Sequence, residues 1–405
     1  MVEVIVEYLN DRVEEKIRTF FASPEDSVYN PEAASENAEE NNELTGPWLG
    51  KIKYHLPLIN SYVLEISEDD LWRLEAVVGI SSVSKTAAVS AQMDAARQTV
   101  RAQVAHNGGF FGYGITIAVL DTGVSPVADL CSTKNRLIAF KDFVNGRRQP
   151  YDDNGHGTHC AAIAAGSGIL SHGKYAGIAP SANLVGVKVL DAEGVGCSSD
   201  VLAGLQWIVD NRERYNIRVA NLSVGTNELQ LNDPLVKAVE AAWDAGIVMT
   251  IAAGNNGPAP SSVTSPGVSR KVVTVGASDD CKPVQIRLEA SQNYSGRGPT
   301  ADCIIKPDIL APGADIVSCL SQTLSKKRAK AKLNRSMCGN YVTMSGTSMS
   351  TPIVSGAIAL LLEKEPTLSP NEVKLRIKKS AECLEYPKNQ QGWGLLNIEK
   401  LLWEV

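Results

Sequence analysis

The sequence predicts an α/β protein in which a parallel sheet lies between helices, preceded by a smaller α+β domain. From about residue 93 onward, runs that are apolar throughout alternate with stretches of helical periodicity, and such runs are typical of strands buried on both faces. The first 92 residues instead follow the order strand, helix, strand, strand, helix, strand. With 405 residues, 44% of them apolar and 21% charged, the chain is long enough to bury two cores.

The front part, residues 1–92, has the βαββαβ order of a small ferredoxin-like domain. We expect strands at 2–9, within 50–67 and at 80–85, and helices at 11–21 and 68–78. Between the first helix and the second strand lies an acidic insertion, residues 24–46, with seven acidic residues and no basic one over 25–43. Such a stretch cannot bury enough apolar surface to order itself, so we expect it to be flexible.

The body of the chain, residues 93–405, alternates apolar runs with helical stretches. The runs predicted as strands are ITIAVLD (115–121), ANLVGVKVL (182–190), RVANLSV (218–224), GIVMTIAAG (246–254) and KVVTVGAS (271–278), and the clearest helices are 198–211 and 233–246. This alternation favours a parallel sheet covered on both faces. Reacting groups in such sheets usually follow the carboxyl ends of strands, so the residues that close these runs are the functional candidates.

Composition excludes several classes of protein. No stretch is long and apolar enough to span a membrane, and the start MVEVIVEYLNDRVEEK lacks the basic flank and apolar block of a secretion signal. The eight cysteines form no CxxC pair, so the sequence indicates neither a zinc site nor a disulfide framework. We therefore expect free thiols and a cytoplasmic protein without membrane or nucleic-acid partners; secretion stays open, because a preceding segment would not be visible.

Charge is unevenly distributed along the chain. Residues 1–92 carry 7 basic and 17 acidic residues, a net charge of −10, whereas the remainder carries +4. The two parts are expected to attract each other, although ordinary variation in surface composition explains the same numbers. Residues 326–335 contain six basic residues and no acidic one; a solvated loop is the default interpretation, and a partner site or self-cleavage point is the alternative.

Four polar residues stand where a reactive site is expected. Asp121 ends an apolar strand, where a carboxylate is costly to bury unless its charge is used. His156 lies among glycines in DDNGHGTHCAAIAAG, and Asn255 directly follows the run VMTIAAG. Ser348, within GTSMSTP (346–352), precedes a long apolar helix. Taken singly, each has an ordinary interpretation as a turn residue or a helix cap.

Together the four side chains supply what acyl transfer requires. A serine hydroxyl is a poor nucleophile until a base removes its proton, and an imidazole titrates near neutrality. A carboxylate holds that imidazole in one tautomer, and an amide with a backbone N–H stabilises the oxyanion of the tetrahedral intermediate. The combination predicts acyl transfer through a serine nucleophile.

Seven blocks give the chain a specific resemblance: in order they are VLDTGV, NGHGTHCA, NLSVG, AAGNNG, YSGRGP, KPDILAPG and GTSMSTP. Over roughly residues 106–400 the chain resembles the subtilisin-like serine peptidases, and it shares the Asp, His, Ser order of subtilisin. The resemblance implies a three-layer subtilisin-like fold and a serine endopeptidase without a cofactor. The implied roles are Asp121 as orienter of the imidazole, His156 as general base and acid, Ser348 as nucleophile, and Asn255 with the Ser348 N–H as oxyanion hole.

The resemblance also implies where a protein or peptide substrate binds, paired in extended form with two edge segments at 193–196 and 222–225. Small residues at 252–254 correspond to the wall of the pocket for P1, the residue whose carbonyl is attacked, and imply a broad specificity that favours large apolar P1 residues. The substrate-binding residues expected on this basis are Gly194, Val195, Gly196, Ser223, Val224, Gly225, Ala252, Ala253 and Gly254.

For residues 1–92 the resemblance implies a propeptide that assists folding, inhibits the enzyme and is removed by self-processing. We expect cleavage between Gln92 and Met93, which leaves a catalytic domain over 93–405. Two alternatives stay open: a dedicated processing protease similar to the clostridial germination proteases, and a regulatory pseudo-enzyme that keeps its front domain. The presence of all four reacting side chains weighs against the second.

The sequence departs from the family pattern in places. Many secreted relatives hold calcium in a loop after the His-bearing helix, whereas residues 166–180 offer few side-chain oxygens. We predict no metal, and leave open a calcium ion at Asp129. Ser350 stands where many relatives have alanine, which replaces no reacting group. We expect His159 to be structural and Cys160 to behave as a small core residue.

Overall fold

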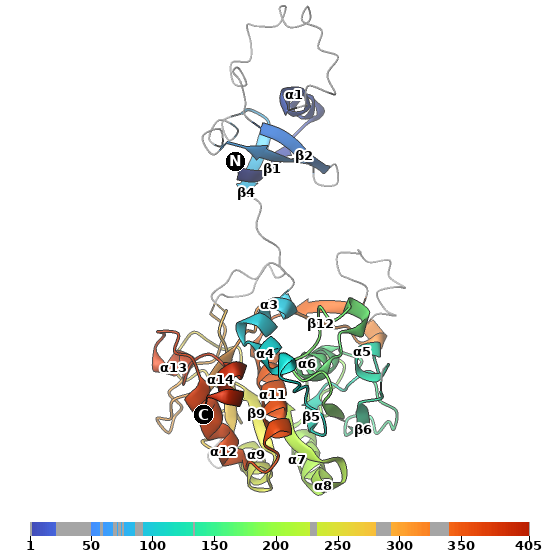
Figure 1. Ribbon diagram of the computed structural model, residues 1–405, viewed down its shortest axis with the longest axis vertical. Helices are drawn as coiled ribbons and strands as arrows, with labels where there is room; N and C mark the ends of the chain where they lie inside the picture. The colour runs from blue at the N-terminus through green and yellow to red at the C-terminus, as the bar shows by residue number, and fades with distance from the viewer. Residues whose placement is uncertain are drawn as a thin grey trace, which may run out of the picture. The chain divides into compact units, whose positions relative to one another are not determined.

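The computed structural model describes residues 2–21, 50–56, 60–67, 71, 74, 77–85, 92–132, 134–226, 233–280, 293–324 and 340–404. The chain divides into two compact units, Met1–Val89 and Ser90–Val405 (Figure 1). The predicted acidic insertion (24–46) and basic segment (326–335) lie outside the described residues, as does most of the predicted helix at 68–78.

The N-terminal unit is a four-stranded antiparallel sheet with a helix packed on it. Its elements are β1 (Val2–Tyr8), α1 (Asp11–Phe21), β2 (Gly50–Leu56), β3 (Ser61–Ile66) and β4 (Ile80–Lys85), with the strand order β2-β3-β1-β4. Its core contains Val4 and Val6, from alternate positions of β1, together with Ile17 of α1 and Leu64 of β3. The four strands and α1 follow the predicted ferredoxin-like order.

The C-terminal unit is built on a seven-stranded parallel sheet. Its strands are β5 (Thr116–Asp121), β6 (Leu137–Asp142), β7 (Asn183–Lys188), β8 (Ile217–Leu222), β9 (Val248–Ala252), β10 (Val273–Ala277) and β11 (Ile309–Ala311), in the order β11-β10-β9-β8-β5-β7-β6. Every residue of β5, β9 and β10 is buried, as expected from their apolar runs. The five predicted strands correspond to β5, β7, β8, β9 and β10.

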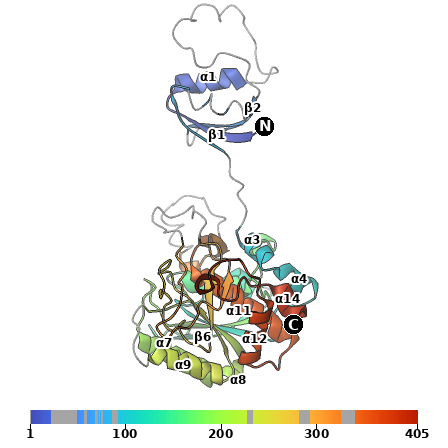
Figure 2. The same ribbon diagram turned by 90° about the vertical axis from the view of Figure 1, so that its left-hand side faces the viewer.

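Helices cover both faces of this sheet, which confirms the predicted architecture. On one face α6 (His156–Ala165) and α11 (Thr347–Lys364) pack against each other and against the central strands. On the other face lie α7 (Ser198–Asp210) and α9 (Pro234–Asp244), which also contact each other. Figure 2 shows α7 and α9 below the sheet and α11 above it.

Shorter elements complete the C-terminal unit: α3 (Gln92–Thr99), α4 (Ala102–Asn107), α5 (Ala128–Cys131), η4 (Ile169–Ser171), α8 (Arg212–Tyr215), the antiparallel pair β12 (Ile316–Cys319) and β13 (Tyr341–Met344), α12 (Pro370–Ser380), α13 (Lys388–Gln391) and α14 (Ile398–Trp403). The six cysteines in the described part of the chain are all unpaired. None of the described helices has the length and hydropathy needed to cross a membrane.

Candidate active site

The predicted reacting residues meet because neighbouring parallel strands end at the same edge of the sheet. Asp121 closes β5, and the adjacent strands β8 and β9 lead directly to Ser223 and, three residues beyond β9, to Asn255. His156 is the first residue of α6 and Ser348 the second of α11, and these two helices pack together.

Asp121 and His156 form a direct pair. Oδ1 of Asp121 lies 2.7 Å from Nδ1 of His156 and also accepts from the N–H of Thr122 at 2.7 Å. Asp121 is fully buried, whereas about a quarter of the His156 side chain, 26%, is exposed. Burial of the imidazole disfavours its charged form, but the Asp121 carboxylate outweighs this effect and raises the pKa of His156 well above its ordinary value. The ring is held in one orientation and remains accessible.

The loop before His156 is shaped by a second buried carboxylate, Asp152, which sequence reasoning missed. Its oxygens accept from the backbone N–H groups of Asn154 (3.1 Å), Gly155 (2.7 Å) and Thr158 (2.8 Å). The hydroxyls of Thr122 (2.9 Å) and Thr158 (2.6 Å) donate to it as well. Burial raises the pKa of Asp152, and these hydrogen bonds oppose the rise. The only sequence signal was an acidic residue shortly before the glycine that precedes α6.

Ser348 is fixed through its backbone carbonyl. Pro352, four residues later, has no N–H, so the Ser348 carbonyl lacks its usual partner within α11. It accepts instead from the hydroxyl of Ser223 at 3.1 Å and from the thiol of Cys160 at 3.3 Å. The Ser348 hydroxyl donates to the carbonyl of Ser223 at 3.2 Å. These contacts tie the start of α11 to α6 and to the end of β8.

Asn255 is exposed, and its amide has a defined orientation. Its Oδ1 accepts from both the N–H and the hydroxyl of Thr347, each at 3.0 Å. Its Nδ2 therefore points away from Thr347 and can donate beside the next residue, Ser348. An amide placed in this way can stabilise negative charge that develops on an oxygen bound to the serine.

Comparison with known proteins agrees with this geometry. The subtilase family profile matches residues 112–394. The chain belongs to the subtilase family. It is 41% identical over 362 residues to serine protease AprX of Bacillus subtilis (strain 168), and this alignment covers 86% of this chain and 80% of AprX. It is 35% identical over 304 residues to subtilisin BL of Lederbergia lenta, and this alignment covers 74% of this chain and 95% of subtilisin BL.

A solved structure extends the comparison to the fold. The crystal structure of a cold-adapted subtilisin-like serine proteinase matches with a TM-score of 0.55 and 31% identity, covering 71% of this chain and 90% of the other. This subtilase is therefore a serine protease with the subtilisin-like fold that its sequence predicts.

A cleft of about 900 Å³ runs beside His156. Its lining includes Asn154, Leu190 and six of the predicted substrate-binding residues: Gly194, Val195, Gly196, Ser223, Val224 and Gly225. Ala252, Ala253 and Gly254 are not part of this lining, and the two alanines are buried. The structure thus gathers the two predicted edge segments around one cleft.

Two residues near the site have the structural roles expected for them. His159 is buried, and its Nε2 lies 3.1 Å from the carbonyl of Ile316 and 3.0 Å from that of Val342. Burial lowers the pKa of His159 to about 3, so the neutral ring joins α6 to β12 and β13. Cys160 is also buried, which raises its pKa and keeps the thiol protonated as a donor to Ser348.

Asp129, the candidate calcium ligand, has both carboxylate oxygens engaged by protein donors. Its Oδ1 accepts from the N–H of Leu170 at 3.2 Å. Its Oδ2 accepts from the hydroxyl of Tyr341 at 2.8 Å and from the thiol of Cys319 at 3.4 Å. Calcium binds six to eight oxygens that face the ion, so a carboxylate enclosed by donors is a poor ligand.

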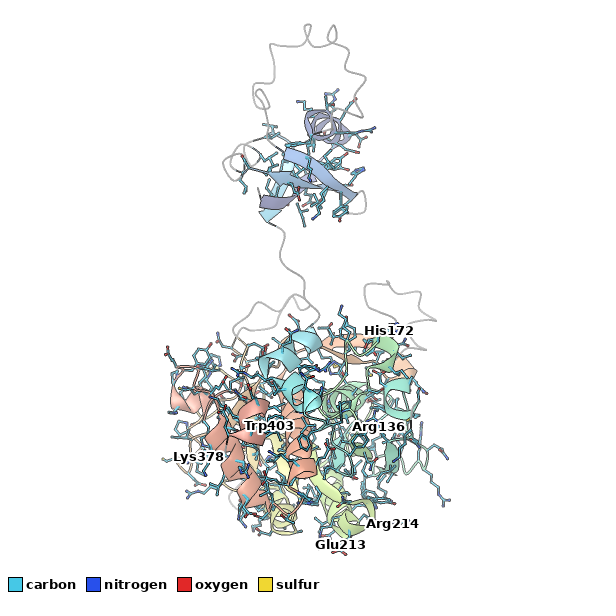
Figure 3. All side chains as sticks on the ribbon, in the orientation of Figure 1. Arg136, His172, Glu213, Arg214, Lys378 and Trp403 are labelled. Atoms are coloured by element: carbon cyan, nitrogen blue, oxygen red, sulfur yellow. The ribbon has the colours of Figure 1, made fainter. Side chains whose placement is uncertain are left out.

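The backbone carbonyls near Asp129 face a cation that belongs to the chain. The buried guanidinium of Arg136, labelled in Figure 3, donates to the carbonyl of Asp129 at 2.5 Å, to that of Ala182 at 3.1 Å and to that of Ala165. Carbonyls turned toward a guanidinium are not free to ligate calcium, and the positive charge would repel the ion. The residues described around Asp129 therefore do not fit calcium.

The predicted processing junction falls at the start of α3. Gln92 and Met93 are the first two residues of that helix, three residues beyond the boundary between the two compact units. Residues 86–91, which precede the helix, lie outside the described residues. The position of the junction stays a prediction.

Proposed function

We propose that this subtilase cleaves internal peptide bonds through an acyl-enzyme formed on Ser348. The proposal rests on one observation: the Asp121–His156 pair, with 2.7 Å between Oδ1 and Nδ1, lies at the same edge of the sheet as Ser348 and Asn255. A non-catalytic binding protein has no physical need for this arrangement.

In the proposed mechanism a peptide pairs in extended form with the edge segments 193–196 and 223–225. The Ser348 hydroxyl turns from the Ser223 carbonyl toward Nε2 of His156 and gives its proton to that nitrogen as Oγ attacks the substrate carbonyl. Asn255 Nδ2 and the Ser348 N–H stabilise the oxyanion. His156 then donates the proton to the leaving amine, and a water molecule activated by the same imidazole hydrolyses the ester, while Asp121 stays ionised throughout.

The test compares two serines that lie two residues apart in α11. Ser348→Ala is expected to abolish labelling by a fluorophosphonate probe and hydrolysis of casein. Ser350→Ala is the matched control: Ser350 is buried, and its hydroxyl has no hydrogen-bond partner among the described residues, so this variant is expected to keep both activities. Casein hydrolysis retained by Ser348→Ala would reject the proposal.

We further propose that the N-terminal unit is a propeptide that the enzyme removes from itself. The division of the chain near residue 90 and the net charge of −10 on residues 1–92 support this proposal. Intact mass after identical expression and incubation provides the test. The wild type is expected to lose about ninety residues and Ser348→Ala to stay whole; cleavage of both proteins would show that another protease does the processing.

The P1 preference needs a separate argument. We propose a broad specificity that favours large apolar P1 residues, because the side chains at 252–254 are small. Two tetrapeptide p-nitroanilides that differ only at P1, phenylalanine in one and alanine in the other, provide the test, and a higher kcat/KM for the alanine substrate would reject this preference.

A further inference from the structure

A row of hydrogen-bonded polar side chains lies behind the nucleophile. It consists of Ser355 in α11, Asn221 in β8 and Ser223 directly after β8, and the first two are fully buried. The hydroxyl of Ser355 donates to Oδ1 of Asn221 at 3.0 Å, and Nδ2 of Asn221 donates to Oγ of Ser223 at 2.9 Å. The Ser223 hydroxyl in turn donates to the carbonyl of Ser348 at 3.1 Å. The row therefore ends on the backbone of the nucleophile.

The hydrogen bonds of this row run in one direction. An amide nitrogen can only donate, so Oγ of Ser223 accepts from Asn221 and its single proton is left for the Ser348 carbonyl. If the Asn221 amide were turned over, its oxygen would attract the Ser223 proton and the Ser348 carbonyl would lose this donor. Pro352 supplies no N–H to that carbonyl within α11. The observed orientation of the amide is thus the one that satisfies the Ser348 carbonyl.

Ser223 also connects this row to the substrate cleft. Its carbonyl accepts from the Ser348 hydroxyl at 3.2 Å, and the residue is part of the cleft lining. Two hydrogen bonds therefore join Ser223 to Ser348, one through the carbonyl and one through the hydroxyl of Ser223. Asn221 controls the second. A displacement of a reacting group by about 1 Å can lower the rate by about 10²-fold, so this control bears on catalysis.

We propose that Asn221 is a positioning residue of this subtilase: by donating to Ser223 it turns the Ser223 hydroxyl toward the Ser348 carbonyl and so fixes the position of the nucleophile. This inference rests on the proposed endopeptidase function of the site. Asn221 is fully buried, so its effect on catalysis passes through Ser223 rather than through contact with substrate. A less well placed Ser348 slows the chemical step without weakening substrate binding, and the effect is therefore expected in kcat rather than in KM.

A double-mutant cycle on kcat, measured with a tetrapeptide p-nitroanilide, tests this route. Asn221→Ala and Ser223→Ala are each expected to lower kcat by about tenfold, because each leaves the Ser348 carbonyl with the Cys160 thiol as its remaining donor. With alanine already at 223, Asn221→Ala is expected to lower kcat further by less than about twofold. Titration of the active sites with the fluorophosphonate probe refers kcat to folded enzyme. Asn221→Leu, which fills the space of the amide, covers the case in which the alanine variant does not fold.

Thr250→Val is the matched control. Its hydroxyl is fully buried and lies 2.6 Å from Oγ of Ser355, at the end of the row that is farther from Ser348. This variant leaves both hydrogen bonds of Asn221 in place and is expected to lower stability while kcat stays within about twofold of wild type.

Three results would overturn the inference: unchanged kcat in the Asn221 variants, losses of kcat that multiply independently in the cycle, or a loss in Thr250→Val as large as that in Asn221→Ala. Failure of the proposed function would look different. Wild type would then neither cleave the p-nitroanilide nor be labelled by the fluorophosphonate probe.

Discussion

Replacing Asp121 by asparagine tests how the buried carboxylate controls the chemistry of His156. Oδ1 of Asp121 is used twice, by Nδ1 of His156 and by the N–H of Thr122, both at 2.7 Å. Oδ2 is buried and has no hydrogen-bond partner in the described part of the chain. An asparagine can therefore place its oxygen where Oδ1 stands and its NH₂ group where Oδ2 stands. The variant loses the charge with little change of shape.

The pH dependence of Asp121→Asn gives the sign of the effect. General base catalysis needs the neutral imidazole, so kcat/KM rises with pH through the pKa of His156 in the free enzyme. Because the Asp121 carboxylate raises that pKa, wild-type activity is lost as the pH falls through a value above the ordinary one for histidine. In the variant the rise in kcat/KM is expected at lower pH. The plateau value is expected to fall by about 10⁴-fold, because the neutral amide gives no counter-charge to the imidazolium that forms during the reaction.

The measurement is kcat/KM of a peptide p-nitroanilide between about pH 5 and pH 10, a range that brackets histidine titration. Asp153→Asn is the matched control. The Asp153 carboxylate accepts a hydrogen bond from Nζ of Lys188 at 2.7 Å and does not bond His156, so its removal is expected to leave unchanged the pH at which kcat/KM rises. If the rise lies at the same pH in wild type and in Asp121→Asn, the carboxylate does not set the pKa of His156, and the reasoning fails.

Three further predictions follow from other contacts. Asn255→Ala removes an oxyanion donor and is expected to lower kcat by about 10²- to 10³-fold with little change in KM; an equal effect on KM would instead indicate a role in substrate binding. Tyr341→Phe removes the 2.8 Å hydrogen bond to Asp129 and is expected to lower the free energy of unfolding by about 2 kcal/mol, without recovery in calcium; recovery would reveal a calcium site. Asn221→Ala removes a side chain that bonds the buried hydroxyls of Ser223 at 2.9 Å and Ser355 at 3.0 Å, and it is expected to lower the free energy of unfolding in denaturant by about 2 kcal/mol. The measurement uses the inactive Ser348→Ala background to prevent self-digestion, and unchanged stability would show that the two hydroxyls find other partners.

The strands that carry the site could be predicted because they are buried on both faces and therefore appear in the sequence as runs of consecutive apolar residues. ITIAVLD corresponds to β5, all six residues of which are buried. The edge strands β6 and β11 escaped prediction for a physical reason. In β6 only Leu137 and Asp142 are buried, and β11 has three residues, so neither produces an apolar run. β6 is largely open to solvent, β11 is buried but too short to form a recognisable run, and the pairing of both depends on neighbours distant in sequence.

The site shows the same division between local and long-range information. Asp121, His156, Asn255 and Ser348 stand at recognisable ends of strands and starts of helices, so local patterns were enough to predict them as one site. Asp152 stands in a loop, and its role becomes visible only in the structure, where it accepts from the hydroxyl of Thr122, 30 residues earlier, and from the N–H groups of Gly155 and Thr158. Side chains that hold a loop in shape are therefore less visible in a sequence than polar side chains that close apolar strands.

Pro352 lies between these two cases. It is visible in the sequence as a proline inside an apolar helix, where it deprives the Ser348 carbonyl of its intrahelical partner. The loss is compensated by the hydroxyl of Ser223, which directly follows β8 and lines the cleft, and by the thiol of Cys160, which lies in α6 with His156. A regular helix would have satisfied that carbonyl internally and left the position of the nucleophile to packing alone. The proline thus converts a local defect into two long-range hydrogen bonds that locate Ser348 relative to both the base and the substrate.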